Sequence, residues 1–164
     1  MNDVKSSEDP TTHRTPVITI GWREWLVLPD LGIPAIKAKI DTGARSSSLH
    51  AHFIEKFEAG GKQRIKFKVR PLRKRKNIEF ICVADLLDVR RVKDSGGHTE
   101  QRYFIRTKAV LAGHCWTIDI SLTSRKDMLF RMLLGRNALA DHFTIDPGRS
   151  YTTGRNLARS YSKE

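Results

Sequence analysis

Asp41, Thr42 and Gly43 are the residues of this sequence best placed to do chemistry. A carboxylate at a tight turn can be held rigidly and approached by a second carboxylate. Two such groups about 3 Å apart cannot both ionise, so they share one proton. The ionised group can then activate a water molecule while the neutral one hydrogen-bonds a carbonyl oxygen. The same tripeptide is also a common turn, so taken alone it favours a structural role for Asp41.

The residues that precede Asp41 predict a strand, because apolar residues alternate with lysines over residues 36–40. The acid therefore stands at the end of a strand with one apolar face. Gly43 lets the chain turn sharply because it has no Cβ atom. Thr42 offers a hydroxyl that could tie the turn to a neighbouring backbone, and Ala44 is small enough for close packing.

A second motif, MLLGRNAL at residues 132–139, joins bulky aliphatic residues to a glycine and then to a predicted helix. With Asp41-Thr42-Gly43-Ala44, it makes the sequence resemble the retropepsin-like aspartic proteases. The resemblance implies that Asp41 is catalytic and that an aliphatic pair crosses behind its loop. The implied support residues are Thr42, Gly43, Ala44, Leu133, Leu134 and Gly135.

Three blocks in order, at residues 21–51, 94–107 and 129–139, give a narrower resemblance. They look like a bacterial group labelled ATP-dependent zinc proteases, whose members are associated with enzymes that ligate glutamate onto a ribosomal protein. This resemblance covers roughly residues 20 to 153. It implies peptidase activity, possibly on glutamate-rich peptides.

Arg45 departs from the viral retropepsins, which usually carry an Asp after Asp-Thr-Gly-Ala. In those enzymes the Asp contacts substrate and pairs with the Arg that corresponds to Arg136. We expect that pairing to be lost here, with Arg45 and Arg136 as candidate substrate-binding residues. A cation beside Asp41 would suit an acidic peptide, although a plain solvated arginine explains Arg45 almost as well.

Residues 90–103 predict a hairpin with Gly96 and Gly97 at its tip. One interpretation makes this hairpin a flap over the cleft, with both glycines near substrate, and the other makes it an ordinary surface turn. Asp94-Ser95-Gly96 is the other candidate tripeptide, but it has no aliphatic-Gly motif of its own. We therefore do not expect it to supply the second carboxylate.

A chain of 164 residues is too short for two complete protease lobes. The second Asp41 should come from another copy, because a two-fold homodimer brings identical loops together at its axis. A strictly monomeric chain would then be inactive or would not be a protease.

The fold class predicted is mainly β: a closed retropepsin-like barrel with one short helix near the C-terminal side, at residues 137–142. The expected strands include residues 65–69, 78–84, 103–111 and 116–122. The expected organisation is a flexible leader at residues 1–16, one domain at residues 17–153 and a polar tail at residues 154–164.

No cofactor is predicted. The sequence has no His-Glu-x-x-His, its histidines offer only His50-x-His52 on one strand face, and no glycine run fits a phosphate loop. Cys82 and Cys115 are expected to be buried, reduced thiols. With no export signal and no run long enough to span a bilayer, the sequence favours a cytoplasmic protein without a membrane partner.

The net charge of +12 predicts anionic partners. Basic residues cluster at Lys62, Arg64, Lys66, Lys68, Arg70, Arg73, Lys74, Arg75 and Lys76. They could collect an acidic or glutamate-tailed peptide, or they could bind RNA or the ribosome. Base stacking needs interleaved aromatic residues, and the only one in this run, Phe67, should point inward. A basic binding module and a catalytically inactive retropepsin-fold scaffold remain the alternatives.

Overall fold

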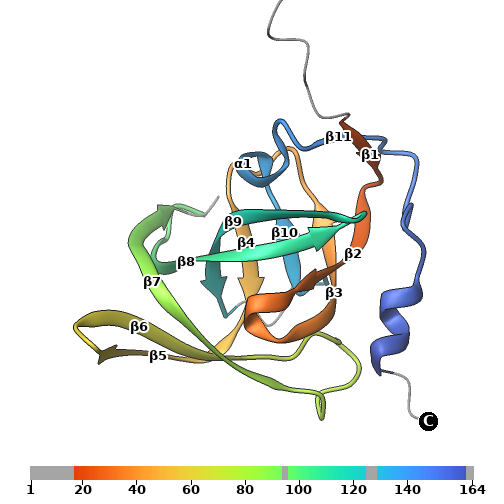
Figure 1. Ribbon diagram of the computed structural model, residues 1–164. Helices are drawn as coiled ribbons and strands as arrows, with labels where there is room; N and C mark the ends of the chain where they lie inside the picture. The colour runs from red at the N-terminus through yellow and green to blue at the C-terminus, as the bar shows by residue number, and fades with distance from the viewer. Residues whose placement is uncertain (1–16, 94–95, 125–128, 162–164) are drawn as a thin grey trace, which may run out of the picture.

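The computed structural model describes residues 17–93, 96–124 and 129–161 (Figure 1). The expected leader at residues 1–16 lies outside these ranges. The strands are β1 (Ile18–Ile20), β2 (Arg23–Leu28), β3 (Ile33–Ile40), β4 (Ser47–His50), β5 (His52–Ala59), β6 (Lys62–Val69), β7 (Phe80–Lys93), β8 (Thr99–Leu111), β9 (His114–Thr123), β10 (Met132–Leu134) and β11 (Phe143–Ile145). The helices are η1 (Pro29–Leu31), α1 (Arg136–Leu139) and η2 (Asn156–Tyr161).

Six strands form a closed barrel, which confirms the predicted fold class. They follow the order β2, β3, β10, β4, β9 and β8, and the pairing of Val27 with Val110 joins β8 back to β2. β7, β6 and β5 continue the sheet beyond β8 and project from one side of the barrel in Figure 1. β1 and β11 form a separate parallel pair.

The predicted strands are present, and their alternation places the apolar side chains in one core. Ile65, Phe67 and Val69 of β6 are fully buried, while the lysines between them are not. The even-numbered residues of β9 from Trp116 to Leu122 are buried in the same way. A two-residue period therefore identified the inner face correctly, including the inward position of Phe67.

β10 lies between β3 and β4, the two strands that the Asp41 segment connects. It runs parallel to β3, with Leu134 opposite Ile40, and antiparallel to β4, with Met132 opposite Leu49. Met132 and Leu134 are fully buried, whereas Leu133 is half-buried. The short strand thus holds both ends of the Asp41 loop from behind.

The C-terminal segment differs from the polar tail expected at residues 154–164. Residues 156–161 form η2, and Tyr161 is only 8% exposed beside Trp25 and Ala35. The Tyr161 hydroxyl donates to the Ala35 carbonyl oxygen and accepts from the Ala35 N–H. This docking explains why the polar segment is ordered; residues 162–164 are not described.

Two smaller expectations need correction. The helix expected at residues 137–142 is the four-residue α1. The structure also contains two 3₁₀ helices, η1 and η2, that the sequence patterns did not predict. Both cysteines are free, but Cys115 is exposed rather than buried, because it lies on the outward face of β9. No helix in the described ranges is long and apolar enough to cross a membrane.

Candidate active site

Asp41 follows β3 directly and is half-buried at the start of a tight loop. Its N–H donates to the Leu134 carbonyl oxygen at 2.9 Å, and its own carbonyl oxygen accepts from the Ala44 N–H at 3.3 Å. Its Oδ1 accepts from the Gly43 N–H at 2.9 Å. Within the described part of the chain, Oδ2 accepts no hydrogen bond. One carboxylate oxygen is therefore anchored while the other is available to a second group.

Gly43 fits this loop for a different reason from the one expected. Its φ lies outside the left-handed region, so the turn does not depend on glycine's backbone freedom. A Cβ atom on Gly43 would instead lie 3.1 Å from Asp41 Oδ1, which is a tight contact. The absence of a side chain leaves space for the carboxylate.

Gly135 and Ser47 link β10 to the far side of the loop. The Gly135 N–H donates to Ser47 Oγ at 3.0 Å, and Ser121 Oγ donates to the Ser47 carbonyl oxygen at 3.2 Å. Ser47 is 1% exposed. The sequence did not predict that Ser47 supports the loop, because a serine after a turn has no distinctive pattern. The pairing of β4 with β9 and β10 is what buries it.

Arg136 contacts the loop itself. Its Nη1 donates to the carbonyl oxygens of Thr42, at 2.9 Å, and Gly43, at 3.1 Å, and its N–H donates to the Ala44 carbonyl oxygen at 2.8 Å. Arg136 was expected to bind substrate, but in this structure its guanidinium donates hydrogen bonds to the backbone of the loop. Arg45 is exposed and makes no ion pair with a described carboxylate.

A cleft of about 420 Å³ adjoins the loop. It is bordered by Ser46 from the loop, Asn137 from α1, and Arg90, Phe104, Arg106, Thr117, Ile118 and Asp119 from β7, β8 and β9. The hairpin expected at residues 90–103 is formed by β7 and β8, so its base lines this cleft. Gly96 and Gly97 lie at the turn, beyond the pairing of Lys93 with Thr99, and are not among the lining residues.

Two arginines in the cleft were not singled out from the sequence. Arg106 donates to Asp119 at 2.8 Å, which raises the pKa of Arg106. Arg90 donates to Asp88 at 2.8 Å and lies over the Phe104 ring at 4.3 Å. Hydrogen bonds from Arg90 and the Val89 backbone lower the pKa of Asp88. Alternating strand positions gave no hint that these side chains border one cleft.

The described residues offer no set of three or more His, Cys, Asp or Glu side chains suited to a metal ion. His50 and His52 have ring centroids 6.5 Å apart, and His52 bonds Glu79 rather than converging with His50. His114 and His142 form a pair at 2.9 Å with no third ligand in the described chain. The described residues therefore do not fit a resident zinc ion.

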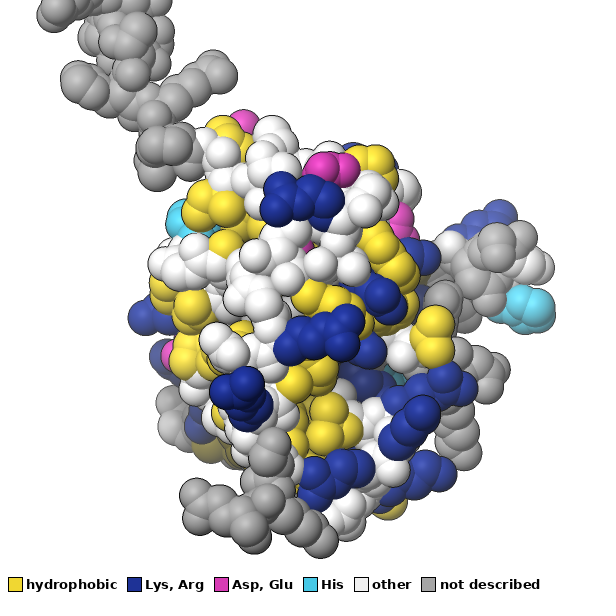
Figure 2. Space-filling model, turned by 90° about the vertical axis from the view of Figure 1, so that its right-hand side faces the viewer, with side chains coloured by type: hydrophobic (Ala, Val, Ile, Leu, Met, Phe, Trp, Pro, Cys, Tyr) yellow, Lys and Arg dark blue, Asp and Glu magenta, His cyan; other side chains and the backbone are white. Residues whose placement is uncertain are grey.

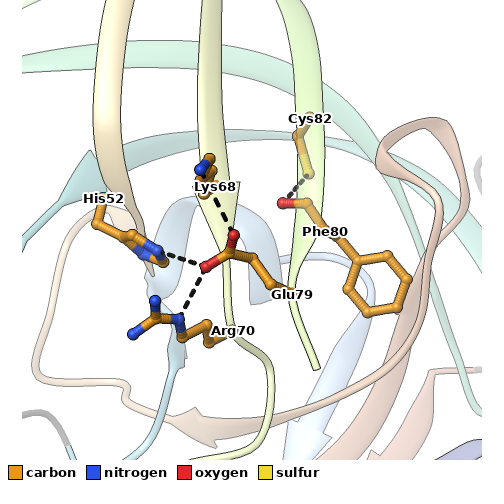
Figure 3. A network of polar contacts seen from close by, with 6 residues as sticks. All are labelled: His52, Lys68, Arg70, Glu79, Phe80 and Cys82. Atoms are coloured by element: carbon orange, nitrogen blue, oxygen red, sulfur yellow. Dashed lines mark hydrogen bonds and ion pairs between the residues drawn. The ribbon is translucent and has the colours of Figure 1, made fainter. Parts of the chain in front are cut away.

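The basic run at residues 62–76 is partly neutralised. Arg64 pairs with Asp85. Glu79 accepts hydrogen bonds from His52 at 3.0 Å and Arg70 at 2.8 Å, and it forms an ion pair with Lys68 at 3.6 Å (Figure 3). Hydrogen bonds from His52 and Arg70 lower the pKa of Glu79. Phe67 is fully buried and cannot stack on a base.

Comparison with known proteins agrees with this geometry. The family model described as "RimB-like: Retropepsin-like aspartic endopeptidase RimB" matches residues 19–156. The chain belongs to this family. That result confirms the resemblance inferred from the two motifs.

Curated relatives include proteins named "Probable alpha-L-glutamate ligase". The one from Desulfotalea psychrophila is 42% identical over 149 residues, which is 88% of this chain and 32% of the relative. The one from Shewanella halifaxensis is 40% identical over 136 residues, which is 83% of this chain and 30% of the relative. This chain thus spans about a third of their length.

A solved structure shares the fold. It is a Legionella pneumophila protein described as having unknown function, and it is 31% identical with a TM-score of 0.71. The match covers 83% of this chain and 98% of that protein.

Proposed function

We propose that this protein is an aspartic peptidase that works as a homodimer, with one Asp41 from each copy. The observation that carries this proposal is the half-buried Asp41 carboxylate, with Oδ1 fixed by Gly43 and Oδ2 unbonded within the described chain. An aspartic dyad needs rigid carboxylates that approach each other across an axis. The family match supports the same reaction.

In the proposed reaction, the two Asp41 carboxyls share one proton and titrate as a pair. The ionised carboxylate accepts a proton from water while the water oxygen attacks the peptide carbonyl carbon. The protonated carboxyl donates a hydrogen bond to the carbonyl oxygen as negative charge develops there. The carboxyl that took the proton from water then gives it to the peptide nitrogen, which leaves as an amine when the C–N bond breaks.

The substrate proposed is an acidic, glutamate-rich peptide. Arg45 supports this choice because it is exposed next to the loop and pairs with no described carboxylate. The net charge of +12 would attract such a peptide over longer distances. The names of the relatives concern glutamate ligation, although this chain matches only about a third of each relative.

The decisive experiment incubates wild type, Asp41→Asn and Asp85→Asn with a peptide that carries a poly-glutamate tail. Mass spectrometry reads the products at acid and neutral pH, and gel filtration measures the oligomeric state. Asp85 is an exposed aspartate on β7 and serves as the matched control. We expect cleavage by wild type and Asp85→Asn as dimers, and none by Asp41→Asn.

Full cleavage by folded Asp41→Asn would overturn the mechanism, and full activity of a strict monomer would overturn the dimer. If wild type cleaves a neutral peptide mixture but not the acidic peptide, the substrate class is wrong. Failure to cleave either material at any pH would favour an inactive scaffold.

A further inference from the structure

A second cavity, of about 600 Å³, lies away from the Asp41 loop. The residues that line it are His50, His52, Phe53, Arg70, Lys76, Ser124 and Arg131. His50 ends β4 and Arg131 precedes β10, whereas the opposite ends of these two strands meet the Asp41 loop. Because β4 has four residues, the cavity is about 10 Å or more from that loop. A ligand in it would not touch Asp41.

The cavity is cationic, and no Asp or Glu is among the residues that line it. Glu79 lies beside it but is already shared among His52, Lys68 and Arg70 (Figure 3). Arg131 and Lys76 form no ion pair with any carboxylate in the described ranges. Lys and Arg side chains also predominate over Asp and Glu on the face shown in Figure 2.

Two buried side-chain nitrogens of residues that line this cavity lack partners. Arg131 Nε and His50 Nδ1 are inaccessible to solvent and make no hydrogen bond in the described structure. His50 is 8% exposed, and its backbone N–H donates to the Arg131 carbonyl oxygen at 2.8 Å, which joins the two residues. An unpaired buried polar group costs free energy. Because Arg131 Nε can only donate, Arg131 favours a ligand that supplies an acceptor.

The charges around Arg131 repel one another. Burial and the nearby Arg73 and Arg70 lower the pKa of Arg131. Arg131 also borders a neighbouring cavity of about 450 Å³ that is lined by Arg73, Lys74 and Arg75. A bound anion would offset this repulsion and offer an acceptor to Arg131.

We propose that the 600 Å³ cavity binds the phosphate group of a small molecule. Arg131, Arg70 and Lys76 supply positive charge, and His50 and Ser124 also line the cavity. These groups come from separate segments of the chain and surround one space. A phosphate fits them better than a single carboxylate does, because it carries about two negative charges and more acceptor oxygens.

Isothermal titration calorimetry tests this site. The probes are inorganic phosphate, pyrophosphate and phenyl phosphate, and each is compared with sodium chloride of equal ionic strength. The three probes separate free phosphate from a phosphate ester. Arg131→Gln removes a charge from the cavity, and Arg64→Gln removes one from the surface of β6 as the matched control. We expect Arg131→Gln to weaken binding about tenfold or more, which is the effect of one charge-assisted hydrogen bond, and Arg64→Gln to leave it within about twofold.

Lys76→Gln provides a second variant because Lys76 is exposed, so its substitution should not affect folding. NMR of the His50 imidazole should show a shift on addition of the probe that binds. Heat no greater than that of sodium chloride, or equal binding by folded Arg131→Gln and wild type, would overturn the proposal. Tighter binding of hexaglutamate than of every phosphate probe would reassign the cavity to acidic peptides. Because Asp41→Asn should bind phosphate normally, this result is independent of the proposed peptidase activity.

Discussion

The backbone of Gly135 packs directly against the carbonyl oxygen of Ser46. A Cβ atom on Gly135 would lie 2.5 Å from that oxygen and 2.9 Å from the Ala44 carbonyl oxygen. The φ of −94° at Gly135 is accessible to any residue, so space rather than conformation requires glycine here. The close contact holds β10 against the loop that carries Asp41.

Gly135→Ala should therefore destabilise the protein by about 1–3 kcal/mol, because the methyl group meets backbone atoms that cannot rotate away. Peptidase activity should fall with it. Urea unfolding followed by circular dichroism measures the change. Gly148→Ala is the control, since its Cβ atom would lie an ordinary 3.4 Å from Asp146 Oδ1. Equal stability of the two variants would contradict this account of Gly135.

Arg136→Gln should lower kcat strongly and lower the free energy of unfolding only slightly. The bonds from Arg136 to Thr42 and Gly43 are exposed, so their loss should cost about 1 kcal/mol or less. A small displacement of the carboxylate should still reduce kcat about tenfold or more. Steady-state kinetics on the acidic peptide separates this effect from that of Arg45→Gln, which should mainly raise KM. A pure KM effect in Arg136→Gln would indicate that Arg136 binds substrate instead.

Tyr161→Phe should destabilise the fold by about 1–3 kcal/mol, because the buried N–H and carbonyl of Ala35 both lose a partner. The pairing of β3 with β2 is irregular in this region, between Leu26 and Leu28. The Tyr161 hydroxyl therefore takes the place of a strand partner for the backbone of Ala35. Thermal unfolding compared with Tyr103→Phe tests the prediction; the Tyr103 hydroxyl makes no hydrogen bond to described residues. An unchanged Tm in Tyr161→Phe would mean that η2 contributes little.

The same tyrosine shows what the sequence could not reveal. The position of Asp41 at the end of β3 was predictable because alternation in residues 36–40 is local, and the LLGRN motif is specific. Tyr161 lies in a polar stretch, so its burial depends on a partner 126 residues away. Ser47 and Arg106 are similar, because their positions are set by strand pairings whose register no local pattern encodes.

Cys115 should react with a thiol reagent in the native protein, and Cys82 should not. Cys115 is exposed, whereas Cys82 is 1% exposed and its burial raises its pKa to about 11. The nucleophile is the thiolate, which Cys82 almost never forms at neutral pH. Mass spectrometry after brief iodoacetamide treatment should find one label in wild type and none in Cys115→Ser, with Cys82 labelled only in urea. Native labelling of Cys82 would show that the core around it opens readily.

His50 should make the protein less stable in mild acid. Burial, followed by the nearby charges of Arg131, His52 and Arg70, lowers the pKa of His50 below its ordinary value of 6.5. Above pH 6.5, His50 is neutral in both the folded and the unfolded protein, so its protonation does not affect the free energy of unfolding. As pH falls below 6.5, the unfolded chain takes up the proton first, so the free energy of unfolding decreases until the folded pKa is passed. Urea unfolding of wild type and His50→Gln from pH 8 to pH 5 should give a difference that is constant above about 6.5 and shifts in favour of the variant below it. Parallel curves over the whole range would show that His50 does not carry this pH dependence.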